Sequence, residues 1–165
     1  MRCNDADHQG ELNVTRSAVR GFSGARLRRI RTDRGLTGDE LADAAGVSYQ
    51  AISHWETGRA TPTPPRLARI ATALNVTISD LVVIPLAKRN LSDLRVQAGL
   101  TQAQLGESAE LSQPVVANLE KGRVEFDAGR AARLAAALGV HTPEVEAAWK
   151  NSRATRAARI RQISS

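Results

Sequence analysis

The chain has 165 residues, of which 42% are hydrophobic but only 3% aromatic, and its formal net charge of +6 comes from 20 Arg and 3 Lys against 17 acidic residues. A single cysteine, Cys3, excludes an internal disulfide and a cysteine-cluster metal site. No apolar run approaches the roughly 20 residues of a membrane span, and the first residues lack the apolar stretch of a signal peptide. We therefore expect a soluble, cytoplasmic, nucleoid-associated all-α protein with cores rich in Ala and Leu.

The positive charge is spread along the chain. The net charge is 0 for residues 1–22, +2 for 23–86, +1 for 87–141 and +3 for 142–165. Arginine suits phosphate and guanine edges better than lysine does, although the codon bias of a GC-rich genome would give the same excess. If the protein binds nucleic acid, it does so with individually placed groups rather than with a polybasic tail.

The sequence contains a repeat with an offset of 64 residues. Residues 35–37 recur at 99–101, and Glu56, Gly58 and Arg59 recur at Glu120, Gly122 and Arg123. Superposing residues 27–81 on 91–145 without a gap gives 18 identities in 55 positions. The chain is therefore a duplicated unit.

The first copy begins with two short helices. Ser23 can cap a helix that carries Leu27 and ends at Gly35. Thr37 followed by Glu40 is a capping box, which predicts a second helix that ends at Gly46.

Three more helices complete this copy. Ser48 can cap a third helix over residues 48–57, with Ile52 and Trp55 turned inward. A Pro-rich stretch at 61–65 leads into a fourth helix, and residues 79–82 form a short fifth one. The pattern predicts one compact five-helix unit.

The second copy repeats this plan, with helices expected over residues 91–98, 101–109, 112–121, 128–138 and from 142 onward. Only Ile84 and Pro85 separate the copies, because helical spacing resumes at Leu86. Such a short linker predicts a fairly fixed orientation between the copies. We expect four regions: a flexible arm (1–22), a first domain (23–85), a second domain (86–147) and a basic helical extension (148–165).

The second and third helices of each copy are joined by a short turn, which is the helix-turn-helix layout. Residues 36–59 and 100–123 resemble the Cro and phage-repressor type of helix-turn-helix protein, also called the XRE family. The resemblance covers about residues 23–83 and 87–147. It implies two tandem five-helix units of the lambda-repressor-like type.

In this family the third helix lies in the major groove, so the resemblance identifies residues 48–57 and 112–121 as recognition helices. The family also places a phosphate-binding Gln at the start of the second helix, which Gln102 matches and Gly38 does not. Unit one is then expected to use its helix amino terminus, Thr37 and Arg59 instead. The candidate DNA-binding residues are Thr37, Ser48, Tyr49, Gln50, Ser53, His54, Arg59, Thr101, Gln102, Ser112, Gln113, Pro114, Asn118 and Arg123.

Tyr49, Gln50 and His54 are expected to face bases in unit one, and Gln113, Pro114 and Asn118 in unit two. Trp55, Ile52, Leu119 and Val116 are assigned to the cores. Glu56 and Glu120 are expected to hold the recognition helix against a nearby arginine in each unit.

The leading hypothesis is a transcriptional repressor or regulator, of which a phage or prophage immunity repressor is one setting. An antitoxin-like DNA-binding protein with a protein partner is the alternative. No catalytic motif or histidine cluster is present, so we expect no enzyme activity, no cofactor and no metal site.

The expected partner is a double-stranded DNA operator, with no membrane. We favour one chain on an asymmetric site, and a homodimer is the rival. Arg16 and Arg20 can reach a minor groove as an arm. For Arg153, Arg156, Arg159 and Arg161, a solvated helix, phosphate contact and a dimer strut all stay open.

Overall fold

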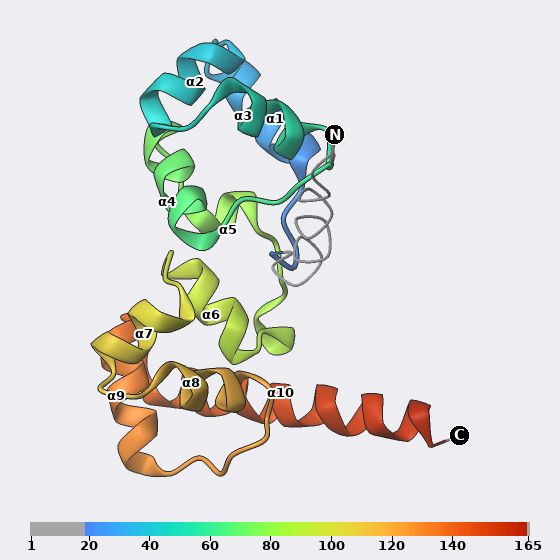
Figure 1. Cartoon of the computed structure of the whole chain (residues 1–165), viewed down its shortest axis with the longest axis vertical. Coiled ribbons are helices and arrows are strands. Elements are labelled where there is room, and N and C mark those ends of the chain that lie inside the picture. Colours follow the sequence, from blue (N-terminus) through green and yellow to red (C-terminus); the bar gives the residue numbers. More distant parts are fainter. Residues whose placement is uncertain (1–18, 165) are drawn as a thin grey trace, which may run out of the picture.

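The computed structural model of the chain describes residues 19–164, and it confirms the all-α fold with two tandem units. Most of the predicted arm, with Cys3 and Arg16, lies outside the described residues. One unit stands above the other, and a long final helix projects from the lower unit (Figure 1). No helix within residues 19–164 has the length and hydropathy needed to cross a membrane.

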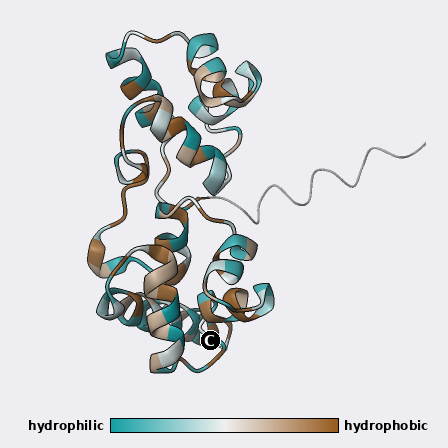
Figure 2. Cartoon of the chain, turned by 90° about the vertical axis from the view of Figure 1, so that its left-hand side faces the viewer, coloured by the Kyte–Doolittle hydropathy of each residue, from teal (hydrophilic) through white to brown (hydrophobic). Residues whose placement is uncertain are grey.

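Unit one consists of the helices α1 (Gly24–Asp33), α2 (Gly38–Ala45), α3 (Tyr49–Glu56), α4 (Pro64–Ala73) and α5 (Ile78–Leu81). Their apolar residues meet inside the unit, whereas polar residues cover the outside (Figure 2). The predicted core residues Ile52 and Trp55 are 1% and 3% exposed. The burial of these side chains in a small helical unit is what fixes the orientation of α3.

Unit two repeats this arrangement with α6 (Leu91–Gln97), α7 (Gln102–Ser108), α8 (Gln113–Glu120), α9 (Ala128–Leu138) and α10 (Thr142–Ile163). Val116 and Leu119 of α8 are buried, as predicted from their spacing. Helix α10 is longer than its counterpart α5. Its first half packs into the unit through Val145 and Ala148, and its second half continues past it (Figure 1).

The predicted helix starts are confirmed in unit one. The hydroxyl oxygens of Ser23, Thr37 and Ser48 accept hydrogen bonds from backbone N–H groups in the first turns of α1, α2 and α3. The expectation that Ser112 caps α8 in the same way is wrong, because its side chain accepts no capping hydrogen bond. Pro114 has no N–H group, so one of the usual donors to such a cap is missing.

The connection between the units is longer than predicted. Residues Leu86–Lys88 form a separate 3₁₀ turn, and α6 begins only at Leu91 with Asn90 as its cap. The expected start of a helix at Leu91 is confirmed, whereas the helical spacing noted from Leu86 corresponds to this separate turn and not to the same helix. The Asn90 side chain caps α6, so a new helix starts there instead of continuing from the turn.

Direct contacts join the two units. Val96 of α6 belongs to the core of unit one, and α4 packs against α6. Gly99 has φ 71°, and a Cβ atom there would lie 2.9 Å from Cβ of Ala68 in unit one, so glycine permits this close approach. Val96 packs in the core of unit one, and the backbone at Gly99 lies close against Ala68. Packing between the units therefore fixes their orientation together with the linker.

An ion pair reinforces this contact. The Arg20 guanidinium pairs with the buried Asp93 carboxylate and donates to the Lys88 carbonyl at 2.8 Å. The hydrogen bond to Asp93 raises the pKa of Arg20. The expectation that Arg20 acts as a minor-groove arm is therefore wrong for this structure, because its side chain holds unit two instead.

The residues next to Arg20 also pack against unit one. Val19 is buried, and Phe22 forms an antiparallel bridge with Val82. The structure thus includes residues 19–22 in the first unit rather than in the arm.

Candidate nucleic-acid interface

An ion pair between the first and third helices recurs in both units. Arg31 Nε donates to Glu56 Oε1 at 2.6 Å, and Arg95 Nε donates to Glu120 Oε1 at 2.5 Å. All four side chains are nearly buried, with exposed fractions between 7% and 12%. The prediction that Glu56 and Glu120 hold the recognition helix against an arginine is confirmed.

Each of these arginines also secures the loop before the second helix. Arg31 Nη1 donates to the Leu36 carbonyl at 2.7 Å, and Arg95 Nη1 donates to the Leu100 carbonyl at 2.9 Å. The hydrogen bond to Glu56 raises the pKa of Arg31. One planar fork thus joins three segments around each recognition helix.

The turn between the second and third helices is held by a second arginine in each unit. Arg69 donates to the Gly46 carbonyl at 3.1 Å, and Arg133 donates to the Glu110 carbonyl at 3.3 Å. Gly46 and Glu110 both have left-handed backbones, with φ of 62° and 53°. This backbone lets the chain reverse before α3 and α8 begin.

The predicted reading face of unit one lies on α3. Tyr49, Gln50 and His54 are exposed, whereas Ser53 is only partly exposed. A Cβ atom at Gly38 would lie 2.8 Å from Cε2 of Tyr49, so the tyrosine ring lies directly over the first residue of α2. A side chain at Gly38, where the resemblance led us to expect glutamine, would therefore meet this ring.

Thr37 lies next to this contact at the start of α2. Its hydroxyl accepts from the Glu40 N–H, and the Glu40 carboxylate accepts from the Thr37 N–H at 2.7 Å, which completes the predicted capping box. These hydrogen bonds hold the pKa of Glu40 below its usual range. The remaining N–H groups at the helix start are available to an external anion.

The reading face of unit two differs at its first position. Gln102 Nε2 donates to Glu120 Oε2 at 2.7 Å, so this side chain is tied to the ion pair behind α8. A glutamine amide carries two N–H groups, and the second is available to a phosphate. Gln113 and Pro114 are exposed at the start of α8, and Asn118 is partly exposed.

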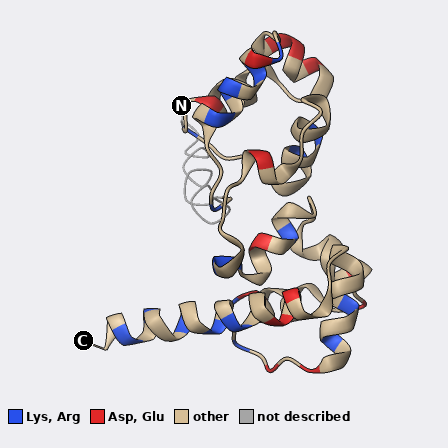
Figure 3. Ribbon diagram, turned by 180° about the vertical axis from the view of Figure 1, so that it is seen from behind, with Lys and Arg blue, Asp and Glu red and all other residues tan. Residues whose placement is uncertain are grey.

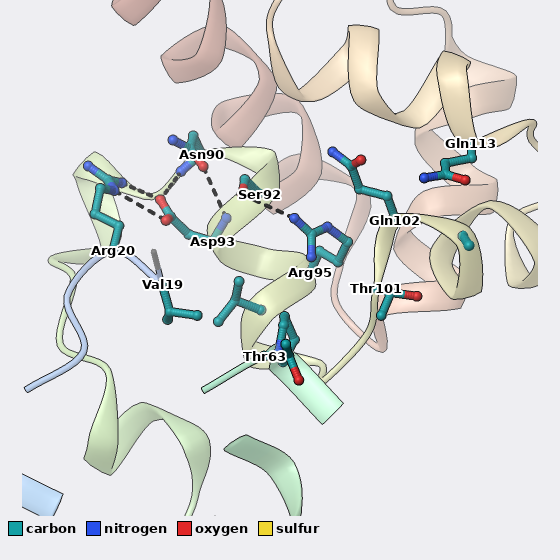
Figure 4. Close-up of a pocket in the computed structure, with 13 residues that line it drawn as sticks. Val19, Arg20, Thr63, Asn90, Ser92, Asp93, Arg95, Thr101, Gln102 and Gln113 are labelled. Atoms are coloured by element: carbon teal, nitrogen blue, oxygen red, sulfur yellow. Dashed lines mark hydrogen bonds and ion pairs between the residues drawn. The ribbon is translucent and has the colours of Figure 1, made fainter. Parts of the chain in front are cut away.

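Three predicted residues of unit two line one groove of about 510 Å³ between the units, namely Thr101, Gln102 and Gln113. Figure 4 shows Gln102 and Gln113 near one another at one end of this groove, with Thr63 of unit one on another side and the Arg20–Asp93 pair at the far end. The amino-terminal side of α7 and α8 is thus open to solvent, and unit one flanks it.

The remaining predicted residues lie around these two faces. Ser48 and Ser112 are exposed just before α3 and α8, and Arg59 and Arg123 are exposed just after them. Each set therefore gathers on one helix-turn-helix, and the structure gives two separate faces instead of one continuous site.

Sequence reasoning missed the residues that support these faces. Arg69 and Arg133 were not expected to clamp the turns, and Gly38 was not expected to seat Tyr49. A signal for the clamp is present in the sequence, since Arg69 and Arg133 are identical residues at the offset of 64.

Comparison with known proteins agrees with this geometry. The family model described as helix-turn-helix matches residues 27–81 and again residues 91–145, which together make up more than half of the chain. The chain belongs to the XRE-type helix-turn-helix family. Both matches contain the ion-paired arginine, the turn and the recognition helix of their unit.

Three curated relatives are transcriptional regulators. Over 64 residues the chain is 38% identical to the uncharacterized HTH-type transcriptional regulator y4dJ of Sinorhizobium fredii, in an alignment covering 39% of this chain and 83% of that protein. Over 57 residues it is 39% identical to the HTH-type transcriptional activator BcrR of Enterococcus faecalis (34% of this chain, 28% of that one). It is 37% identical to the HTH-type transcriptional regulator DdrOP3 of Deinococcus deserti over 57 residues (34% and 44%).

The chain therefore spans less than half the length of two of these relatives. Family and relatives together support DNA-binding transcriptional regulation, a class of proteins that are normally not enzymes.

Proposed function

We propose that the protein is a sequence-specific repressor that binds double-stranded DNA with α3 and α8 in successive stretches of major groove. The observation that carries this proposal is that α3 and α8 each have one exposed side and one buried side. Helix α3 exposes Tyr49, Gln50 and His54, and helix α8 exposes Gln113 and Pro114 with Asn118 partly exposed. The opposite face of each helix is buried and is held by the Arg31–Glu56 or the Arg95–Glu120 pair. A reading helix needs such support, because base contacts require side chains held in register with the groove.

In unit one, Gln50 makes the bidentate contact to adenine that its amide geometry suits. Tyr49 contacts a thymine methyl group or a phosphate, and His54 donates to a guanine edge. Thr37 and Arg59 bind phosphates on either side of the groove, and Ser48 and Ser53 add shorter polar contacts. This assignment is supported by the exposure of Gln50, Tyr49 and His54 on one helix.

In unit two, Gln113 and Asn118 read adenine, and Pro114 offers apolar contact only. Gln102, Thr101, Ser112 and Arg123 bind the backbone. Because these base-facing residues differ from those of unit one, the two halves of the operator differ in sequence.

A single chain carries both readers, so we propose that it binds an asymmetric operator as a monomer. The fixed contact between the units raises the effective concentration of the second reader once the first has bound. Occupancy of such a site blocks a promoter, and the resemblance to phage repressors makes an immunity repressor the setting we favour.

The test compares a base reader with a phosphate binder. After selection of the bound sequence from random duplexes, Gln50→Ala should weaken binding to that sequence by about 1–3 kcal/mol and relax the preference at one base pair. Arg59→Ala, the matched control on the same unit, should weaken binding to selected and random duplexes alike. Equal loss on both duplexes for Gln50→Ala would contradict the base-reading role.

A further inference from the structure

The second half of α10 is a projecting basic helix. From Arg153 to Ser164 every residue is exposed, and this segment extends beyond the packed body of unit two (Figure 1). No acidic residue follows Glu146, whereas Lys150, Arg153, Arg156, Arg159 and Arg161 lie in this stretch. Figure 3 shows these positive residues distributed along the helix. The family matches end at residue 145, so the duplicated units do not account for this feature.

The base of the projecting helix is attached beside the end of α8. A Cβ atom at Gly122 would lie 2.8 Å from Cα of Arg153, so the two backbones touch at a position where only glycine fits. Arg156 Nη1 donates to the Gly122 carbonyl at 3.3 Å. Gly122 lies between Lys121 and Arg123, which are both exposed. The positive charge of α10 is thus continuous with that at the end of the recognition helix.

Aromatic contacts hold this junction in place. Trp149 stacks on Phe126 with ring centroids 5.3 Å apart, and the Arg153 guanidinium lies 5.0 Å from the Trp149 ring centre. Two acidic residues, Glu125 and Asp127, flank Phe126 in the chain. Asp127 caps α9 and pairs with Arg130, so its charge is partly compensated within unit two.

The residue pattern favours a polyanion over an apolar partner. Ile160 and Ile163 are 51% and 77% exposed, but Arg156 lies on the same side of the helix, one and two turns earlier. A coiled-coil seam or a membrane-bound helix needs an apolar stripe separated from the charges. Two copies paired along the segment from Arg153 to Ser164 would also place four positive charges against four.

We propose that the projecting half of α10 binds the phosphate backbone of the DNA that flanks the half-site read by α8. This proposal rests on the proposed function of α8. Because the projecting half of α10 starts beside the end of α8, insertion of α8 into the major groove brings these arginines toward the neighbouring backbone. Eleven residues of helix span about 16 Å, enough to follow two or three phosphates of one strand.

The experiment measures how the affinity of the full chain for its selected duplex depends on salt. The variant Arg156→Gln with Arg159→Gln should lower the slope of log affinity against log salt by about 1.8, as expected for two lost phosphate contacts. Between about 50 and 200 mM salt, the affinity of the unchanged protein should then fall about tenfold more than that of the variant. The sequence preference of both proteins should be the same.

Two control variants separate local contact from overall charge. Arg28→Gln with Arg29→Gln removes the same charge from exposed positions on α1 and should leave the slope nearly unchanged. Arg156→Lys with Arg159→Lys keeps the charge on α10 and should keep most of the slope. Circular dichroism of each variant checks that the helix content is retained.

Three outcomes would overturn the proposal. The first is an unchanged slope in the glutamine variant, and the second is an equal decrease in the α1 control. The third is a dimer without DNA that is lost when residues 159–165 are removed, which would assign the helix to a second copy. Failure of the proposed function looks different, because the unchanged protein would then select no preferred duplex.

Discussion

The two copies share the same buried ion pair and the same turn contact, but they differ on the exposed surface of the second and third helices. Arg31, Glu56 and Arg69 in unit one have the same partners as Arg95, Glu120 and Arg133 in unit two. The reading faces differ, because unit one places Tyr49 over Gly38 whereas unit two ties Gln102 to Glu120. Packing and buried charge limit which residues can occupy the shared ion-pair and turn positions, whereas the exposed positions are less restricted and differ between the copies.

Loss of the buried carboxylate should have the largest effect. Glu120→Ala leaves Arg95 without its partner in a nearly buried position and should lower the free energy of unfolding of unit two by about 3 kcal/mol. Glu56→Ala should cost unit one a similar amount, since its pair is buried to the same degree. Urea denaturation followed by circular dichroism measures both.

Glu107→Ala is the control for this comparison, because Glu107 is exposed on α7. Its cost should stay within about 0.5 kcal/mol. If Glu120→Ala lowered the free energy of unfolding as little as this control, the ion pair would not stabilise unit two.

Replacing Gly38 and Tyr49 of unit one by the residues that unit two has at the same positions tests whether this difference between the copies affects DNA binding. Gly38→Gln introduces a Cβ atom 2.8 Å from the Tyr49 ring, which must then move. This single variant should weaken binding to the selected duplex by about 1–3 kcal/mol, as for a lost base contact. The double variant with Tyr49→Gln installs the pair found in unit two, Gln102 and Gln113, and should recover binding with an altered preference.

Fluorescence anisotropy with the selected duplex measures affinity, and a new selection measures preference. If Gly38→Gln alone bound the original duplex with unchanged affinity, Tyr49 would have no role in reading it.

A smaller effect is expected at the turn. Glu110 has φ 53° where unit one has Gly46, and an L-residue with a side chain is strained in this conformation. Glu110→Gly should therefore stabilise unit two by about 0.5–1 kcal/mol, after the entropy cost of glycine is subtracted. Asn75→Gly, at another left-handed position, should be nearly neutral because asparagine tolerates this backbone. Thermal unfolding would contradict this account if both variants had the same effect.

The sequence predicted the features that depend on local chemistry. The period of 64 residues, the capping box of Thr37 and Glu40 and the burial of Trp55 follow from spacing and residue type. The arginine that pairs with Glu56 was expected, but its identity as Arg31 was not, because 25 residues separate them.

Features made by contacts between the units could not be predicted in this way. The pairing of Arg20 with Asp93 spans 73 residues and depends on how α4 meets α6. Such contacts follow from the relative placement of whole units, which no short pattern encodes. By contrast, a helix from residue 142 and a helical extension after 147 were both expected from the sequence, and in the structure they are one helix, α10.

In the proposed function, one chain binds an asymmetric site with two different helices. Sedimentation of the protein with its selected duplex counts the chains on each site. We expect one chain per duplex and a consensus whose two halves differ, with the half bound by α8 lost when Gln113 and Asn118 are replaced by alanine. Two chains on a palindromic consensus would contradict this expectation.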